Sequence, residues 1–322
     1  MAISIIFVGM SIAFHKPSIE EVKALIQKEL RDIPLDNLGI KVGENHQISP
    51  IYTNSNKSIE IPSLLDYKVV FQLFSLSHSE ADIHNKNLLQ ALENGQNGLI
   101  LDFNNENWNL EELGKLFINI RLDYVHSEFL NINSETENTI LQYINSNYTK
   151  LSWNNFALSK EVFCISDENF YSSAAGFIKS FRDEKAFIHI ELSGDYFRDI
   201  AKIRAFKILL YQHRKLEGLS TDFLLIGETN LNNKTKENPE NNILKLTTEA
   251  MSALIGGCEG IWIRPHDYQT DSKFSTRIAR NIFHLMQEEA YMHLVNDVSS
   301  GSYFIEEYTE AVAREIYLAL ND

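Results

Sequence analysis

The strongest constraint on the fold of this chain is an alternation, from Tyr67 onward, of short apolar segments with longer segments of helical periodicity. Eight short segments have the length and composition of buried strands: residues 67–74, 98–103, 120–125, 161–166, 186–192, 222–227, 260–264 and 292–296. Parallel neighbouring strands need a crossover between them, which the intervening helices supply. The near-continuous apolar strands are typical of a parallel sheet that is covered on both faces.

The segments between the strands show the spacing of amphipathic helices. Two sets of apolar residues recur every three or four positions: Phe274, Ile278, Ile282 and Leu285, and Tyr308, Val312, Ile316 and Leu320. In residues 195–216, Ile200 and Ile203 are predicted to face inward and Arg198, Lys202 and Lys207 outward. Eight β-α units in about 255 residues favour an α/β fold of the (β/α)8 TIM-barrel type. A doubly wound sheet is the alternative.

The residues ahead of the barrel predict an N-terminal helical and extended arm. Pro17 and Ser18 precede a helix that carries Ile19, Val22 and Ile26 on one face. The expected domains are therefore the arm, residues 1–65, which would serve as a subunit-contact extension, and the barrel, residues 66–322. The apolar residues 1–14 have no basic residue before them and are too short to cross a bilayer, so we expect them to pack against this chain or a partner.

Charge and cysteine content restrict the classes of partner. The formal net charge of −15 disfavours nucleic-acid and membrane surfaces, whose phosphates attract Lys and Arg. It leaves open a local basic pocket for one phosphorylated small molecule. The two cysteines, Cys164 and Cys258, lie in apolar segments and are expected to be reduced, packed thiols. We therefore expect a cytoplasmic protein.

In a barrel, the reactive residues stand at the C-terminal ends of the strands. The predicted strand ends carry Ser75, Asp102, His126, Asp167, Ser193, Glu228, Pro265, His266, Asp267 and Asp297. His266 and Asp267 could form an acid–base pair. The favoured interpretation is a loop that hydrogen-bonds its own turn, because neighbouring His and Asp are common. His189, inside a strand, is expected to be a hydrogen-bonded core residue.

Several ordered fragments resemble a known family. They comprise residues 233–235, 242–253 and 256–258, the run Arg277-Ile278-Ala279-Arg280-Asn281, and residues 287–289 and 301–306. Residues 200–205 and 85–95 add two weaker matches. In this order the fragments resemble the barrel of methylmalonyl-CoA mutase, as found in its small (beta) subunit, over most of the chain.

The chain departs from the catalytic members of that family where their chemistry is located. Catalytic subunits carry a histidine after strand four that hydrogen-bonds the substrate thioester, whereas residues 165–172 contain none. Catalytic subunits also carry a substrate-contacting segment, Gln-Thr-Ser-Gly-Trp-Ser, after strand six. In this chain residues 227–232 read Gly-Glu-Thr-Asn-Leu-Asn instead. The sequence ends at Asp322, and the C-terminal cobalamin-binding domain of the family is expected to be absent. Asp82-Ile83-His84 begins like a cobalt-ligating motif, but Asn87 replaces the glycine that the motif requires, so a solvated helical turn is favoured.

The resemblance therefore implies a non-catalytic small-subunit barrel with no catalytic residue, cofactor site or metal site of its own. The implied partner is a large catalytic subunit that binds adenosylcobalamin and interconverts (R)-methylmalonyl-CoA and succinyl-CoA. The arm would contact that subunit in a heterodimer, and a homodimer is the alternative assembly of the isolated chain.

The other hypothesis makes the chain an enzyme. It would act on an acyl-CoA with His266, Asp267, Glu228 and Asp167, or form the barrel half of a split mutase whose cobalamin domain is another chain. The feature that separates the two hypotheses is the barrel axis, where bulky inward residues would close a substrate channel. The residues expected there are Phe71, Phe163, His189 and Trp262.

Overall fold

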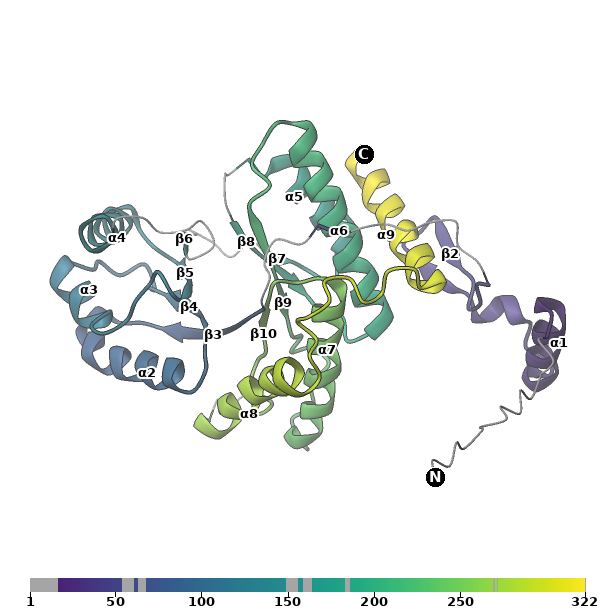
Figure 1. Ribbon diagram of the computed structural model, residues 1–322, viewed down its shortest axis with the longest axis horizontal. Helices are drawn as coiled ribbons and strands as arrows, with labels where there is room; N and C mark the ends of the chain where they lie inside the picture. The colour runs from purple at the N-terminus through teal and green to yellow at the C-terminus, as the bar shows by residue number, and fades with distance from the viewer. Residues whose placement is uncertain are drawn as a thin grey trace, which may run out of the picture.

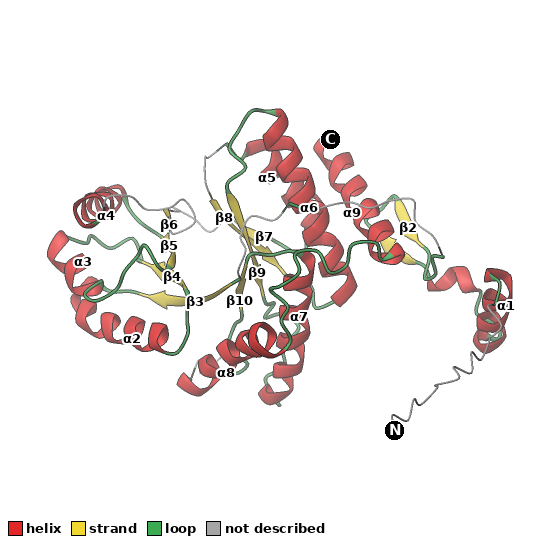
Figure 2. Ribbon diagram, viewed as in Figure 1, coloured by secondary structure: helices red, strands yellow, loops and turns green. Residues whose placement is uncertain are grey.

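The computed structural model describes residues 17–53, 61–62, 68–148, 156–158, 164–182, 186–268, 270 and 272–321. A curled parallel sheet forms its centre, with helices on the outside (Figures 1 and 2). The eight strands are β3 (Val69–Ser75), β4 (Gly98–Asp102), β5 (His126–Leu130), β6 (Phe156–Leu158), β7 (Cys164–Ile165), β8 (Ala186–Glu191), β9 (Phe223–Glu228) and β10 (Gly260–Trp262).

The strand order confirms the predicted barrel-type fold. Neighbours run β6-β5-β4-β3-β10-β9-β8-β7, and every described pair is parallel. The last strand, β10, pairs with the first, β3, as in a closing (β/α)8 barrel and unlike a doubly wound sheet. Within the described residues, β6 and β7 are the two edges of this curled sheet.

Helices connect the strands and cover the outside of the sheet. The helices of the barrel are α2 (Ala81–Glu93), α3 (Leu110–Leu116), α4 (Ser134–Asn147), α5 (Phe170–Ser180), α6 (Tyr196–Leu216), α7 (Asn242–Gly256), α8 (Lys273–His284) and α9 (Tyr303–Asn321). Shorter turns are η2 (His78–Glu80), η3 (Pro239–Asn241) and the π-turn η4 (Leu285–Glu289). Local sequence sets their ends: Asn109 and Glu112 form a capping box at α3, and Gly257 ends α7 with φ of 101°.

The predicted strand at residues 120–125 is wrong, and β5 begins where that segment ends. Residues 120–125 form turns, with the Tyr124 amide donating to the Arg121 carbonyl. The apolar pattern did not predict β5, because two of its fully buried positions are the polar residues Ser127 and Glu128. As a result His126 lies at the N-terminal end of β5, at the opposite end of the barrel from the position expected for it.

Two further differences concern short segments. Residues 292–296, predicted as the eighth strand, are turns that follow η4, with Leu294 and Val295 exposed. The fourth barrel strand along the chain is instead β6, only three residues long and not predicted from the sequence.

Helix α6 is buried far more completely than its sequence predicts. It packs between the sheet and α9 (Figure 1), and Lys202 and Lys207, expected outside, are buried. Each lysine has a carboxylate partner: Lys202 Nζ lies 2.5 Å from Asp167 Oδ1, and Lys207 contacts Glu259. These partners come from residues distant in sequence, so spacing along the helix could not reveal them.

The arm has a docked part and a projecting part. It consists of α1 (Ile19–Leu30), η1 (Leu35–Leu38), β1 (Ile40–Val42) and β2 (His46–Ile48). The β1–β2 hairpin packs on α9, where His46 Nδ1 lies 2.6 Å from Glu315 Oε1. Helix α1 buries no residue and extends away from the barrel (Figure 1). The apolar residues 1–14 lie outside the described residues.

Two smaller expectations can be compared with the structure. Cys258 is buried as expected, but Cys164 is exposed. Among the described residues, no helix is long and apolar enough to cross a membrane.

Candidate functional site

Aromatic rings fill the interior of the barrel. The Phe71 ring lies between β4 and β10, where a β-carbon at Gly98 would lie 2.7 Å and one at Gly260 2.5 Å from ring atoms. Phe187 meets this ring edge-on, with centroids 5.8 Å apart, and Trp262 belongs to the same buried cluster. Of the four residues expected to close the axis, Phe71, His189 and Trp262 are therefore buried inside, and Phe163 lies outside the described residues.

Next to this cluster, four charged residues form a network, three of them from strands and the fourth from the segment that follows β10. His189 on β8 donates through Nε2 to Glu128 Oε2 on β5, at 2.8 Å. Its Nδ1 lies 3.5 Å from Glu228 Oε2 on β9. Glu228 also contacts Arg264, which follows β10 and stacks over Trp262 with 4.1 Å between guanidinium carbon and ring centroid. Two cations and two carboxylates thus balance each other inside the barrel.

The network holds His189 in its charged form. Burial opposes the imidazolium, but the carboxylates of Glu128 and Glu228 outweigh burial and raise the pKa of His189 to about 9. Burial likewise opposes the charge of Glu228, but His189 and Arg264 hold the pKa of that carboxyl below its usual range. A histidine that is protonated at neutral pH has no lone pair to accept a proton, so His189 is not suited to act as a general base.

The raised pKa of His189 predicts a pH-dependent stability. Because the folded pKa of about 9 exceeds the unfolded value of about 6.5, the stabilisation is complete below pH 6.5 and is lost as pH rises through 9. We expect the free energy of unfolding to fall by about 3 kcal/mol over this interval. Urea unfolding of the wild type and His189→Gln between pH 6 and pH 10 measures it. Parallel curves for the two proteins would contradict the assignment, and His78→Gln, on an exposed histidine, serves as control.

The predicted site residue Asp167 belongs to a second group, at the start of α5. It pairs with Lys202 and with Arg198, whose Nη2 lies 3.3 Å from Asp167 Oδ1. Its backbone amide donates to Glu191 Oε2 at 3.1 Å, and Glu191 pairs in register with Glu228. Asp167 and Glu228 therefore lie on the same side of the barrel, each neutralised by its own cations.

His266 and Asp267 form a third group, in the loop that leads into α8. Asp267 Oδ2 accepts hydrogen bonds from Thr270 Oγ1 at 2.7 Å and Ser272 Oγ at 2.9 Å. Burial opposes its charge, yet the neighbouring hydroxyl groups lower the pKa of the carboxyl. The His266 ring is buried and meets Phe274 edge-on. The carboxylate thus stabilises the turn at the start of α8, and the four candidate residues are divided among three separate groups.

The remaining motif, Asp82-Ile83-His84, lies on α2. His84 Nε2 accepts a hydrogen bond from the Ser77 amide at 3.0 Å, which engages one of the two ring nitrogens through which a histidine can bind a metal. No group of three or more potential metal-ligating side chains occurs among the described residues.

Sequence reasoning missed Glu128 and Arg264, which complete the network around His189. Glu128 was missed because the strand was predicted at residues 120–125. In a strand that starts at His126, the alternation of side chains between the two faces places Glu128 on the inner face with Leu130. Arg264 follows Trp262 by two residues, the spacing that places both on one face of an extended chain.

Comparison with known proteins finds relatives of the second half of the barrel. A family model described as methylmalonyl-CoA mutase matches residues 184–322. The methylmalonyl-CoA mutase small subunit of Porphyromonas gingivalis is 35% identical over 141 residues, which cover 41% of this chain and 23% of that protein. The probable small subunit of Mycobacterium tuberculosis strain H37Rv is 32% identical over 132 residues, covering 38% of this chain and 22% of that protein.

A shorter relative matches a smaller part. A methylmalonyl-CoA mutase homolog of Alkalihalophilus pseudofirmus is 35% identical over 80 residues, or 24% of this chain and 54% of that protein. The aligned stretches thus span less than a quarter of the two small subunits. Residues 200–205, 233–258 and 277–306, which suggested the family from sequence, lie inside the matched segment, whereas residues 85–95 lie outside it. Residues 184–322 are therefore similar to the methylmalonyl-CoA mutase family.

Proposed function

We propose that this chain is a non-catalytic, small-subunit-like barrel that supports a large catalytic subunit of adenosylcobalamin-dependent methylmalonyl-CoA mutase. The large subunit would interconvert (R)-methylmalonyl-CoA and succinyl-CoA. The names of the relatives favour a subunit of this kind. The observation that carries the proposal is the filled barrel interior, since a substrate channel along the axis would need the space that Phe71, Phe187 and Trp262 occupy.

The charged groups support the same proposal. His189 and Glu228 neutralise each other inside the barrel, and Asp167 and Asp267 are engaged with neighbouring cations and hydroxyl groups. A general acid or base needs a pKa near the working pH and access to substrate. Glu228, Asp167 and Asp267 are each engaged by neighbouring cations or hydroxyl groups in three separate places, so they do not converge on one substrate position.

In this proposal the chain binds no cofactor or metal itself. Adenosylcobalamin would supply the radical chemistry from the partner subunit. On this chain, His84 is the histidine nearest to the cobalt-ligating pattern, and its hydrogen bond from Ser77 together with Asn87 at the glycine position does not fit that role.

The projecting arm offers the surface for the partner. Helix α1 has apolar side chains along one face but buries none of them in this chain, and Leu25 is 61% exposed. Leu38, just beyond α1, is also exposed. Apolar side chains gathered on a protruding helix gain stability by burial against a second protein. We propose that this second protein is the large subunit, with a homodimer of the isolated chain as the competing assembly.

Co-expression with the cognate large subunit tests the proposal. We expect the two chains to co-elute in size-exclusion chromatography, and Leu25→Asp to abolish co-elution by placing a carboxylate on the apolar face of α1. Ala24→Asp, on an exposed neighbouring position away from that face, should leave the complex intact.

Ligand binding separates the two hypotheses of function. We expect the isolated chain to show no calorimetric binding of methylmalonyl-CoA or succinyl-CoA at micromolar concentrations, and the mutase rate to depend on the large subunit. Failure of the two chains to associate, or micromolar binding of either acyl-CoA that is lost on mutating Glu228, would overturn the proposal in favour of an enzyme in its own right.

A further inference from the structure

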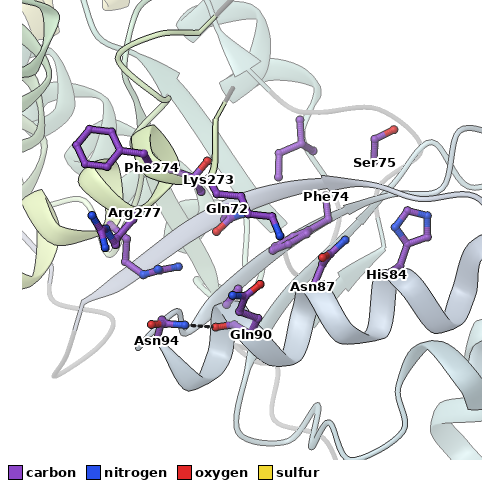
Figure 3. Close-up of a pocket in the computed structure, with 14 residues that line it drawn as sticks. Gln72, Phe74, Ser75, His84, Asn87, Gln90, Asn94, Lys273, Phe274 and Arg277 are labelled. Atoms are coloured by element: carbon purple, nitrogen blue, oxygen red, sulfur yellow. Dashed lines mark hydrogen bonds between the residues drawn. The ribbon is translucent and has the colours of Figure 1, made fainter. Parts of the chain in front are cut away.

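A cavity of about 680 Å³ lies on the outside of the barrel, between α2 and α8. Its floor is the outer face of β3, where Gln72 and Phe74 stand, and α2 contributes Asn87 and Gln90 to one wall (Figure 3). This volume lies in the range of small-molecule sites and exceeds what a single inorganic ion fills. The cavity is separate from the network inside the barrel.

The opposite wall, from α8, is strongly basic. Lys273, Arg277 and Arg280 all line the cavity, and no Asp or Glu is among its lining residues. Arg277 lies on the α8 side of the cavity (Figure 3), where its guanidinium carbon is 5.3 Å from the centroid of the Phe274 ring. In a chain of net charge −15, three cations facing one cavity without a carboxylate form a local field that favours an anion.

Arg280 provides the second, independent observation. Its side chain is only 9% exposed, and its Nε has no hydrogen-bond partner. Four other buried cations, Lys202, Arg204, Lys207 and Lys234, each contact a carboxylate. Buried Lys68 and Arg214 donate to the backbone carbonyls of Cys258 and Ser220. Arg280 has no ion-pair partner among the described residues. Burial and the charge of Arg277 both lower the pKa of Arg280. A buried guanidinium without a counter-charge is costly, and an anion between the two arginines would relieve that cost.

We propose that this cavity binds a phosphorylated small molecule, whose phosphate oxygens accept hydrogen bonds from Arg280, Arg277 and Lys273. Guanidinium groups suit phosphate because their donors match two oxygens at once. The rest of the ligand would lie along the amides of α2 and Gln72, whose Oε1 is buried without a partner. Phe274, 55% exposed at the rim, offers a ring face for an apolar or aromatic portion.

Calorimetry and thermal denaturation of the full chain test this site. The probes are inorganic phosphate, pyrophosphate and ADP at one fixed ionic strength. We expect ADP or pyrophosphate to raise the unfolding temperature and to bind more tightly than phosphate, with an affinity that falls as salt is added. Tighter binding of ADP than of pyrophosphate would identify a nucleotide-like ligand, and the reverse order a free polyphosphate group.

Substitution of Arg280 tests directly whether this residue binds the ligand. Arg280→Met should weaken binding by about tenfold or more. The unliganded variant should be at least as stable as the wild type, because it removes an unpaired buried charge. Arg314→Met is the matched control: it deletes an exposed arginine of α9 and should leave the affinity unchanged.

Three results would overturn the proposal. The first is the absence of binding by all three probes to the wild type. The second is equal affinity for the wild type and Arg280→Met. The third is a loss of stability in the unliganded Arg280→Met variant, which would make Arg280 a structural residue.

Discussion

Replacing Arg204 by methionine is expected to lower the free energy of unfolding by about 3–5 kcal/mol. The Arg204 guanidinium is fully buried between α6 and α9, where it contacts Asp297 and lies 3.2 Å from Glu306 Oε1. Methionine preserves the apolar length of the side chain but leaves these carboxylates facing each other with little access to water. Removing one partner of a buried ion pair costs far more than the pair itself contributes.

Urea unfolding measures this loss, and a control on α9, the helix that Arg204 packs against, isolates its cause. Arg314→Met removes an arginine that contacts Glu310 on the exposed side of α9 and should change stability by no more than about 0.5 kcal/mol. Amide hydrogen exchange should show that the loss of protection in Arg204→Met is concentrated in residues 297–309. A stability within about 0.5 kcal/mol of the wild type would show that the carboxylates find other partners or protonate without cost.

Replacing Glu128 by leucine is the second change with a large expected effect, again about 3–5 kcal/mol of stability. Glu128 gives His189 its shortest contact, at 2.8 Å, and both side chains are fully buried. Without Glu128, Glu228 alone must balance both His189 and Arg264. The imidazolium is then no longer favoured, so the decline in stability between pH 6.5 and pH 9 should largely disappear.

A double variant distinguishes the charge from the packing at this site. Glu128→Leu with His189→Leu removes both members of the pair and leaves Glu228 neutralised by Arg264. We expect it to recover much of the lost stability, because replacing a whole buried pair by apolar side chains is often close to neutral. Unfolding free energies that simply add between the single variants would mean that the two side chains do not interact.

The general architecture could be predicted from the sequence because it depends on local periodicity. Runs such as residues 222–227 read as strands, and Tyr308, Val312 and Ile316 mark the buried face of α9, as the structure confirms. In such patterns each position is classed as buried or exposed from its own side chain alone. They therefore indicate elements and their order, and here they suffice for a barrel with helices outside.

The charged interior could not be predicted in this way, because it depends on pairs of residues far apart in the chain. Glu128 and His189 are each unfavourable in a core, and each becomes acceptable only beside the other. The same holds for Lys207 with Glu259. Arg280 is the converse case, since its sequence neighbours give no sign that it lies buried without a partner on a cavity.

The strand order also has a consequence for how the chain reaches its native state. Strands β3–β6 and β7–β10 each pair with sequence neighbours, and within the described residues the two sets join through the ladder between β3 and β10. That ladder unites strands from opposite ends of the barrel sequence, so closing it carries the largest loss of chain entropy. Each half-barrel can gather its local contacts first. The joining of β3 to β10 is then the late, slow step of folding, and the place where the two halves would separate first under tension.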